Sequence, residues 1–94
     1  MNAVLLHRDR LDFDDGSVVE MVVWLVPRPV TGSRHPSKYR LYFGRHGRLL
    51  VLYDNERGKG DHRHRGDVEE AYEFKSVDQL VNDFLTDVAE ERKR

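Results

Sequence analysis

The chain has 94 residues, no cysteine and nearly balanced charge, with 16 Lys and Arg against 17 Asp and Glu. This length suits a single domain over residues 1–94, and the lack of cysteine excludes disulfides, thiolate metal sites and cysteine nucleophiles. No apolar run approaches the roughly 20 residues of a membrane-spanning helix, and the first residues do not resemble a signal peptide. We therefore expect a soluble cytoplasmic protein without a membrane partner.

Charge is distributed unevenly along the chain. Residues 1–33 carry a net charge of −2, residues 34–65 a net charge of +6, and residues 66–94 a net charge of −5. The middle third is therefore cationic and the final third anionic, a difference that the near-neutral total conceals.

The first half of the chain predicts strands. Residues 3–13 and 17–26 are separated by Asp14-Asp15-Gly16, and an Asp-Gly pair favours a tight hairpin turn. Residues 21–26 are apolar on both faces, so we expect a central strand covered on both sides. All three prolines fall within residues 27–37, which predicts one long loop.

Residues 38–45 and 49–53 predict a second pair of strands around a short turn. In the first of these strands one face carries Tyr39, Leu41 and Phe43, and the other carries Lys38, Arg40 and Tyr42. A further strand is predicted over residues 68–74, with Tyr72 and Phe74 on its apolar side.

A helix is predicted from Ser76, because Ser76-Val77-Asp78-Gln79 forms a capping box. Its apolar stripe comprises Val77, Leu80, Val81, Phe84, Leu85 and Val88, and its polar face comprises Asp78, Asn82, Asp83 and Asp87. The predicted fold is α+β, with an antiparallel β-sheet of four to five strands and one C-terminal helix packed on one face. One helix leaves the other sheet face open, with Tyr42, Leu50 and Leu52 pointing away from the helix. A strongly twisted sheet would hide some of these residues within the monomer, but we favour a protein–protein surface covered by a second copy or another protein.

Residues 54–66 form a basic, glycine-rich segment that we expect to be a loop. It carries the cations Arg57, Lys59, Arg63 and Arg65, together with His62 and His64. Such a segment is either a solvated connection or a surface for a phosphorylated ligand, and the alternation of histidine with arginine favours the second reading. In a strand, this alternation would place the histidines on one side and the arginines on the other.

RNA cleavage is the chemistry that these residue types fit best. It needs a base for the 2′-hydroxyl, an acid for the leaving oxygen and cations around the phosphate. We assign the acid and base roles to His62 and His64, without a metal or another cofactor. The predicted substrate-binding residues are Arg57, Lys59, Arg63, Arg65, Asp54, Lys38 and Arg40, with Asp54 orienting a histidine or an arginine.

A metal site is the second chemical option. His62 and His64 could supply two imidazoles, with Asp54, Asp61 or Asp67 as an oxygen ligand. Two features of the sequence argue against it: Arg63 and Arg65 would place positive charge beside the cation, and no third ligand follows at a compact spacing. A non-catalytic module that binds RNA or a protein through the same segment is the other alternative.

Several short segments together resemble the TumE-like toxins of bacterial type II toxin–antitoxin pairs. They are Tyr53-Asp54-Asn55, Gly60-Asp61-His62-Arg63-His64, Asp15-Gly16-Ser17 and Lys38-Tyr39-Arg40. The resemblance extends from the first hairpin to the final helix. It implies a toxin role and a helix-turn-helix antitoxin as partner, whereas RNA as the target and a possible homodimer are our own expectations.

Overall fold

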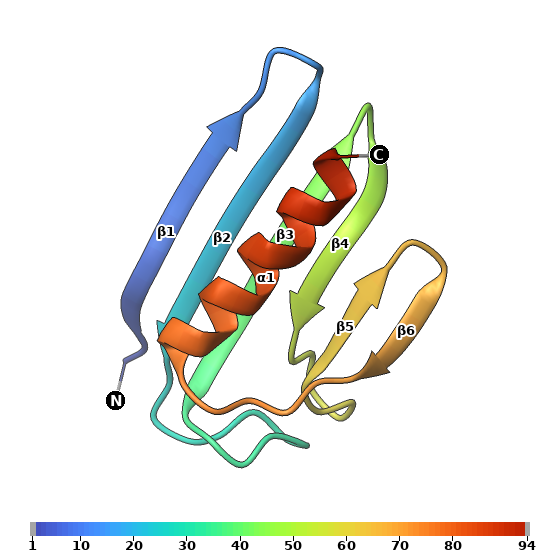
Figure 1. The fold of residues 1–94 in the computed structure, drawn as a ribbon. Helices are drawn as coiled ribbons and strands as arrows, with labels where there is room; N and C mark the ends of the chain where they lie inside the picture. The colour runs from blue at the N-terminus through green and yellow to red at the C-terminus, as the bar shows by residue number, and fades with distance from the viewer. Residues whose placement is uncertain (1, 94) are drawn as a thin grey trace.

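The computed structural model describes residues 2–93, in which six strands are followed by one helix. The elements are β1 (Val4–Asp12), β2 (Ser17–Leu25), β3 (Ser37–Arg45), β4 (Arg48–Asp54), β5 (His62–Arg65), β6 (Val68–Ala71) and α1 (Val77–Arg92). Each strand pairs antiparallel with the next one along the chain, which gives the order β1-β2-β3-β4-β5-β6 (Figure 1). The predicted α+β class with one C-terminal helix is confirmed. The predicted count of four to five strands is wrong.

The additional strand is β5, which lies where we expected only a loop. It pairs with β4 on one side and with β6 on the other, and Gly66 adopts a positive φ of 57° in the turn between β5 and β6. The prediction failed because strands are recognised by alternating apolar residues, whereas β5 alternates histidine with arginine. The last strand ends at Ala71, and Tyr72 and Phe74 pack against the core from the segment that follows it.

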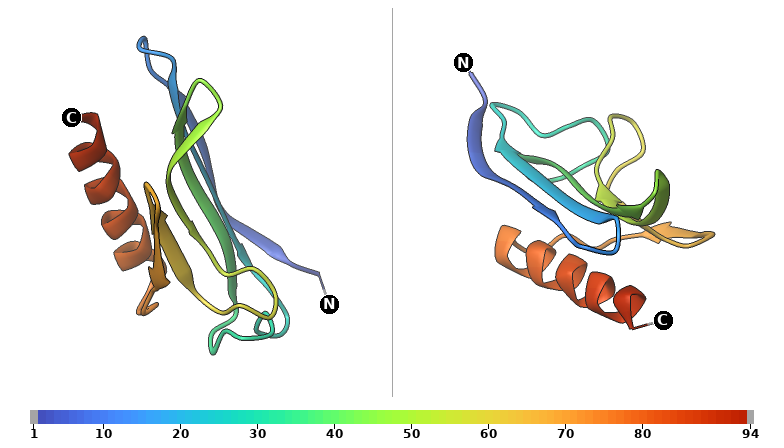
Figure 2. Two further views of the ribbon diagram at one scale, coloured as in Figure 1. Left: turned by 90° about the vertical axis from the view of Figure 1, so that its right-hand side faces the viewer. Right: turned by 90° about the horizontal axis from the view of Figure 1, so that it is seen from above.

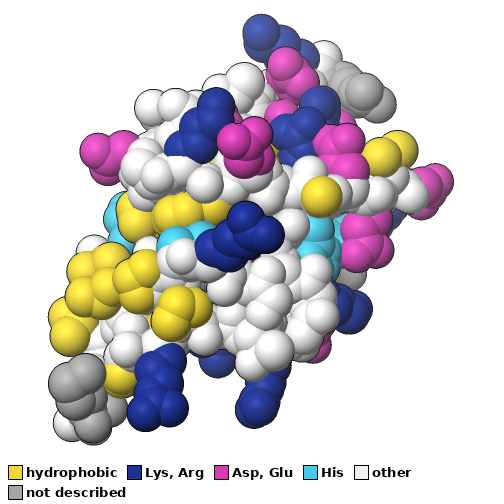
Figure 3. Space-filling view, turned by 90° about the horizontal axis from the view of Figure 1, so that it is seen from below, with side chains coloured by type: hydrophobic (Ala, Val, Ile, Leu, Met, Phe, Trp, Pro, Cys, Tyr) yellow, Lys and Arg dark blue, Asp and Glu magenta, His cyan; other side chains and the backbone are white. Residues whose placement is uncertain are grey.

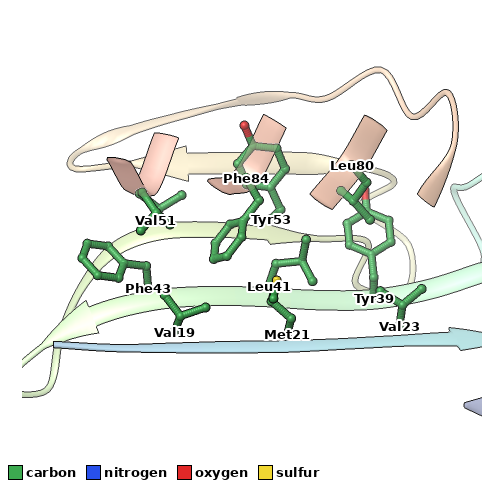
Figure 4. Close-up of a cluster of buried hydrophobic side chains, with 11 residues drawn as sticks. Val19, Met21, Val23, Tyr39, Leu41, Phe43, Val51, Tyr53, Leu80 and Phe84 are labelled. Atoms are coloured by element: carbon green, nitrogen blue, oxygen red, sulfur yellow. The ribbon is translucent and has the colours of Figure 1, made fainter. Parts of the chain in front are cut away.

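The core lies between α1 and one face of the sheet (Figure 2). Alternate residues of β2, β3 and β4 point toward the helix, as the close-up in Figure 4 shows. The buried apolar residues are Val19, Met21, Val23, Tyr39, Leu41, Phe43, Val51, Tyr53, Leu80, Phe84 and Val88. The helix runs across β3 and β4, so the central strands receive most of the cover.

The predicted cap of α1 is confirmed, because the Gln79 backbone N–H donates to Ser76 Oγ at 3.0 Å. The predicted polar face needs one correction. Asp87 is only 5 % exposed and accepts a hydrogen bond from the Tyr53 hydroxyl. Its position three residues after Phe84 places it on the buried side of the helix.

Among residues 2–93 no helix packs on the second sheet face, and we call it the open face (Figure 2). β2 is central, as predicted, but its residues on this face are only half-buried, so the expected cover on both sides is absent within residues 2–93. Tyr42 and Leu52 pair across this face. Leu50 instead packs against the core, because an irregular register between Phe43 and Gly44 inserts one extra residue in β4.

No helix within residues 2–93 has the length and hydropathy that a membrane crossing requires.

Candidate active site

The antiparallel register brings both predicted catalytic histidines to the open face. Directly paired residues share a face of the sheet, so two rows can be followed across the strands. One row contains Val22, Arg40, Asp54 and His62, and the adjacent row contains Glu20, Tyr42, Leu52, His64 and Glu69. The two imidazoles have ring centroids 6.0 Å apart.

His62 is held firmly in place at the start of β5. It is 7 % exposed, and its Nδ1 lies 2.9 Å from the Gly60 carbonyl oxygen. A carbonyl can only accept, so Nδ1 carries the proton and Nε2 of the neutral ring keeps its lone pair. That Nε2 lies 3.7 Å from Asp54 Oδ1 and 3.5 Å from Glu69 Oε1.

His64 and Glu69 complete a three-residue cluster with His62. His64 Nε2 lies 3.7 Å from Glu69 Oε1, and one donor atom from each of the three side chains lies within 4.8 Å of the others. His64 and Glu69 are more exposed than His62, with side-chain exposures of 26 % and 52 %. In the view from below, histidine and acidic side chains adjoin at one edge of the molecule (Figure 3). The cluster therefore joins a fixed imidazole to two groups that solvent can reach.

Glu69 was missed in the sequence because residues 54–66 were expected to be a loop, so its strand had no predicted partner that would bring it to a histidine. The signal that could have identified it is the turn at Gly66-Asp67, which pairs Arg65 with Val68 and therefore His64 with Glu69. Once the turn is recognised, the carboxylate falls directly opposite an imidazole.

Arg63 and Arg65 lie on the opposite face of β5, toward α1. Arg63 donates to Glu70 at 2.5 Å and to the Tyr53 hydroxyl at 3.0 Å. Arg65 donates to Glu90 at 2.7 Å and lies 3.4 Å from Asp87. The structure therefore does not bring these two predicted phosphate-binding arginines together with the histidines.

Asp87 ties this hairpin to the helix. Its carboxylate accepts from Tyr53 and lies within 3.5 Å of Arg63 and 3.4 Å of Arg65. Burial, and then the hydrogen bond to Asp87, raise the pKa of the Tyr53 hydroxyl well above its usual range, so it remains a neutral donor. This arrangement fixes the hairpin that carries the cluster.

The remaining predicted cations lie on or beside the open face. Lys38 and Arg40 are exposed, Arg40 shares the row of His62, and its guanidinium lies 5.2 Å from the centre of the Tyr42 ring. Lys59 lies in the loop before β5 and lines a shallow hollow of about 470 Å³ with His62 and Glu69. Arg57 is in the same loop and lines a different hollow with Lys38. Of these four predicted cations, Arg40 and Lys59 are therefore tied directly to the cluster, through a shared row and a shared hollow.

Asp61 and Asp67 do not join the cluster. Asp61 accepts hydrogen bonds from Ser33 and Tyr39 at 2.6 and 2.7 Å, and lies 2.6 Å from His35 Nε2. Burial opposes ionisation of Asp61, but these hydrogen bonds outweigh it and lower its pKa. Asp61 therefore fastens the loop before β5 to the loop before β3, and His35 belongs to this support.

Comparison with known proteins identifies the family of the chain. No curated protein and no solved structure matches the chain. A family model described as Toxin TumE matches residues 3–92. The chain therefore belongs to the TumE toxin family.

Proposed function

We propose that this chain is the toxin of a type II toxin–antitoxin pair and that it cleaves RNA at the cluster of His62, His64 and Glu69. The observation that carries this proposal is the placement of both imidazoles on the open face, in the same rows as Arg40 and Tyr42. The face thus combines groups that can move protons with groups that can hold a polyanion.

The open face has the composition of a single-stranded RNA surface. Such surfaces combine cations that contact the backbone with aromatic rings on which bases stack. Lys38 and Arg40 supply exposed cations, and Tyr42 and Trp24 are half-buried aromatic residues on the same side of the sheet. A strand of RNA lying across β3 and β4 would bring a phosphate toward β5.

The proposed reaction is an internal transfer at phosphorus. A base removes the proton of the 2′-hydroxyl, the 2′-oxygen forms a bond to phosphorus, and the bond from phosphorus to the 5′-oxygen breaks. An acid gives a proton to that leaving oxygen, so the products are a 2′,3′-cyclic phosphate and a 5′-hydroxyl. Without a metal, one of the two histidines, His62 and His64, acts as the base and the other acts as the acid. Lys38, Arg40 and Lys59 supply charge for the phosphate.

The test compares RNA cleavage by the wild type with that by His64→Ala, with and without excess EDTA. The control is His46→Asn, which removes an imidazole from the β3–β4 turn, where residue 46 has a φ of 50° that asparagine tolerates. For the reaction without a metal, we expect the wild type and the control to cleave RNA both with and without EDTA, and His64→Ala to cleave it in neither condition. RNA binding without cleavage by the wild type would favour the non-catalytic module, and cleavage by folded His64→Ala would overturn the assigned site.

We further propose that the antitoxin is a helix-turn-helix protein that covers the open face with acidic residues. A toxin family implies an antitoxin partner in general, and the exposed cations Lys38 and Arg40 offer charge complementarity. Replacing both by glutamate should abolish complex formation with the product of the neighbouring reading frame. Unchanged binding would place the antitoxin elsewhere.

A further inference from the structure

We propose that His62, His64 and Glu69 form a binding site for a divalent transition-metal ion, with Asp54 as an additional oxygen donor. Two imidazoles and one carboxylate are a donor set that proteins use for zinc, iron and related ions. The inference rests on three separate observations: the spacing of the donor atoms, the fixed orientation of His62, and a buried carboxylate oxygen without a partner.

The spacing of the donor atoms is close to what a metal requires. Metal–nitrogen and metal–oxygen bonds of about 2.0–2.2 Å in a tetrahedral site place neighbouring donors about 3.3–3.6 Å apart. Glu69 Oε1 lies 3.5 Å from His62 Nε2 and 3.7 Å from His64 Nε2, and Asp54 Oδ1 lies 3.7 Å from His62 Nε2. These three distances lie within a few tenths of an ångström of the required spacing, and the donor atoms of His62, His64 and Glu69 all lie within 4.8 Å of one another.

The orientation of His62 is that of a metal ligand. A ligating histidine typically donates its other ring N–H to a carbonyl or carboxylate, which fixes both tautomer and ring direction. His62 Nδ1 makes this bond to the Gly60 carbonyl, and Gly60 has the positive φ of 75° that glycine accommodates. The Nε2 lone pair is therefore aimed at Glu69 and Asp54 from a side chain that is more than nine-tenths buried.

Asp54 supplies the third observation. Its Oδ1 is buried and has no hydrogen-bond partner among residues 2–93, although buried carboxylate oxygens are normally paired. His62 Nε2 does not satisfy this atom, because it carries no proton in the assigned tautomer and because 3.7 Å exceeds the 2.7–2.9 Å typical of a charge-assisted hydrogen bond. A cation between these side chains would satisfy Asp54, Glu69 and both Nε2 atoms together.

Both arguments that the sequence raised against a metal are removed by the fold. Arg63 and Arg65 point to the other face of β5, where acidic side chains of β6 and α1 neutralise them. The missing third ligand is Glu69, which the β5–β6 turn places opposite His64. Since two of the three donors are imidazoles, the site should prefer Zn²⁺ to Mg²⁺, which favours oxygen ligands.

Metal binding itself stands on this geometry, whereas a role for the metal in cleavage rests on the proposed function. In that role the ion would polarise the phosphate and activate a water molecule or the 2′-hydroxyl. The histidines would then act as ligands instead of carrying protons. This version predicts that EDTA stops cleavage.

The experiment is calorimetric titration of Zn²⁺ and Mg²⁺ into the full chain, purified without a polyhistidine tag and stripped of metal. We expect one Zn²⁺ per chain and no comparable heat with Mg²⁺. His64→Ala and Glu69→Gln should each weaken Zn²⁺ binding at least about tenfold, and His46→Asn should leave it unchanged. Both ligand variants alter side chains that are partly exposed, so we expect both proteins to fold. Circular dichroism checks this expectation.

Titration with Co²⁺ adds a second readout, because a site of low coordination number gives visible absorption bands that His64→Ala should abolish. The absence of Zn²⁺ binding by the wild type, or equal binding by wild type and folded His64→Ala, would overturn the metal site. Zn²⁺ binding without any RNA cleavage would leave the metal site standing and refute the proposed reaction. Cleavage in EDTA by a wild type that binds Zn²⁺ would confine the ion to a non-catalytic role.

Discussion

Substituting the cations of the open face and a cation of the helix side in separate variants distinguishes RNA binding from fold stability. The double substitution Lys38→Gln/Arg40→Gln should weaken RNA binding and reduce its salt dependence, because both side chains project from the open face. Each phosphate contact to single-stranded RNA contributes about 0.7 to the slope of log affinity against log salt. Loss of two contacts should therefore lower the slope by about 1.4, which corresponds to about sevenfold less sensitivity between 50 and 200 mM salt.

Arg65→Gln should lower the stability of the fold and leave RNA binding unchanged. Arg65 contacts Glu90 and Asp87 on the helix side and is 30 % exposed, so its loss should cost about 1–2 kcal/mol of unfolding free energy after allowance for solvent screening. Its RNA affinity and salt slope should match the wild type. Filter binding at several salt concentrations and urea denaturation measure the two quantities. A drop in RNA affinity for Arg65→Gln as large as that of the open-face double variant would refute the assignment of faces.

Three further predictions concern the support of the site. Asp87→Ala should lower the unfolding free energy by about 2–3 kcal/mol, because the buried Tyr53 hydroxyl loses its acceptor, and a loss below about 0.5 kcal/mol in urea denaturation would contradict this. Ser76→Ala should cost about 1 kcal/mol through the lost helix cap, measured in the same way. The lowered pKa of Asp61 should stabilise the fold fully above about pH 4, and this contribution should disappear as the pH falls through that lowered pKa. Urea denaturation at several pH values gives the unfolding free energy as a function of pH, and below about pH 4 this free energy should change less with pH in Asp61→Asn than in the wild type. The same pH dependence in both proteins would exclude the mechanism.

The parts of the fold with a strong periodic pattern could be predicted from the sequence. The apolar alternation of β3 and the cap at Ser76 identified their elements because local spacing decides which face is buried. β5 was missed, since its burial depends on partners that only the tertiary fold provides. Asp87 was placed on the polar face because its aspartate side chain suggested solvent, although its helical position faces Tyr53.

The candidate site was predictable only in part. His62 and His64 stood out by residue type, and their strand places them on one face together, as strict alternation requires. Whether Arg63 shares that face could not be decided while the segment was taken for a loop. Glu69 and the unpaired oxygen of Asp54 depend on the register of β4, β5 and β6, which follows from hairpin geometry and not from composition.

The strand order has a consequence for how this toxin matures. Because every strand pairs with the one synthesised just before it, the growing chain can add hairpins successively on the ribosome without waiting for distant segments. The contact between Asp87 and the arginines of β5 is the exception, since Asp87 belongs to the helix, which follows all six strands in the sequence. We therefore expect nascent chains to hold a loosely anchored β5–β6 hairpin until this helix has been synthesised and can pack against it.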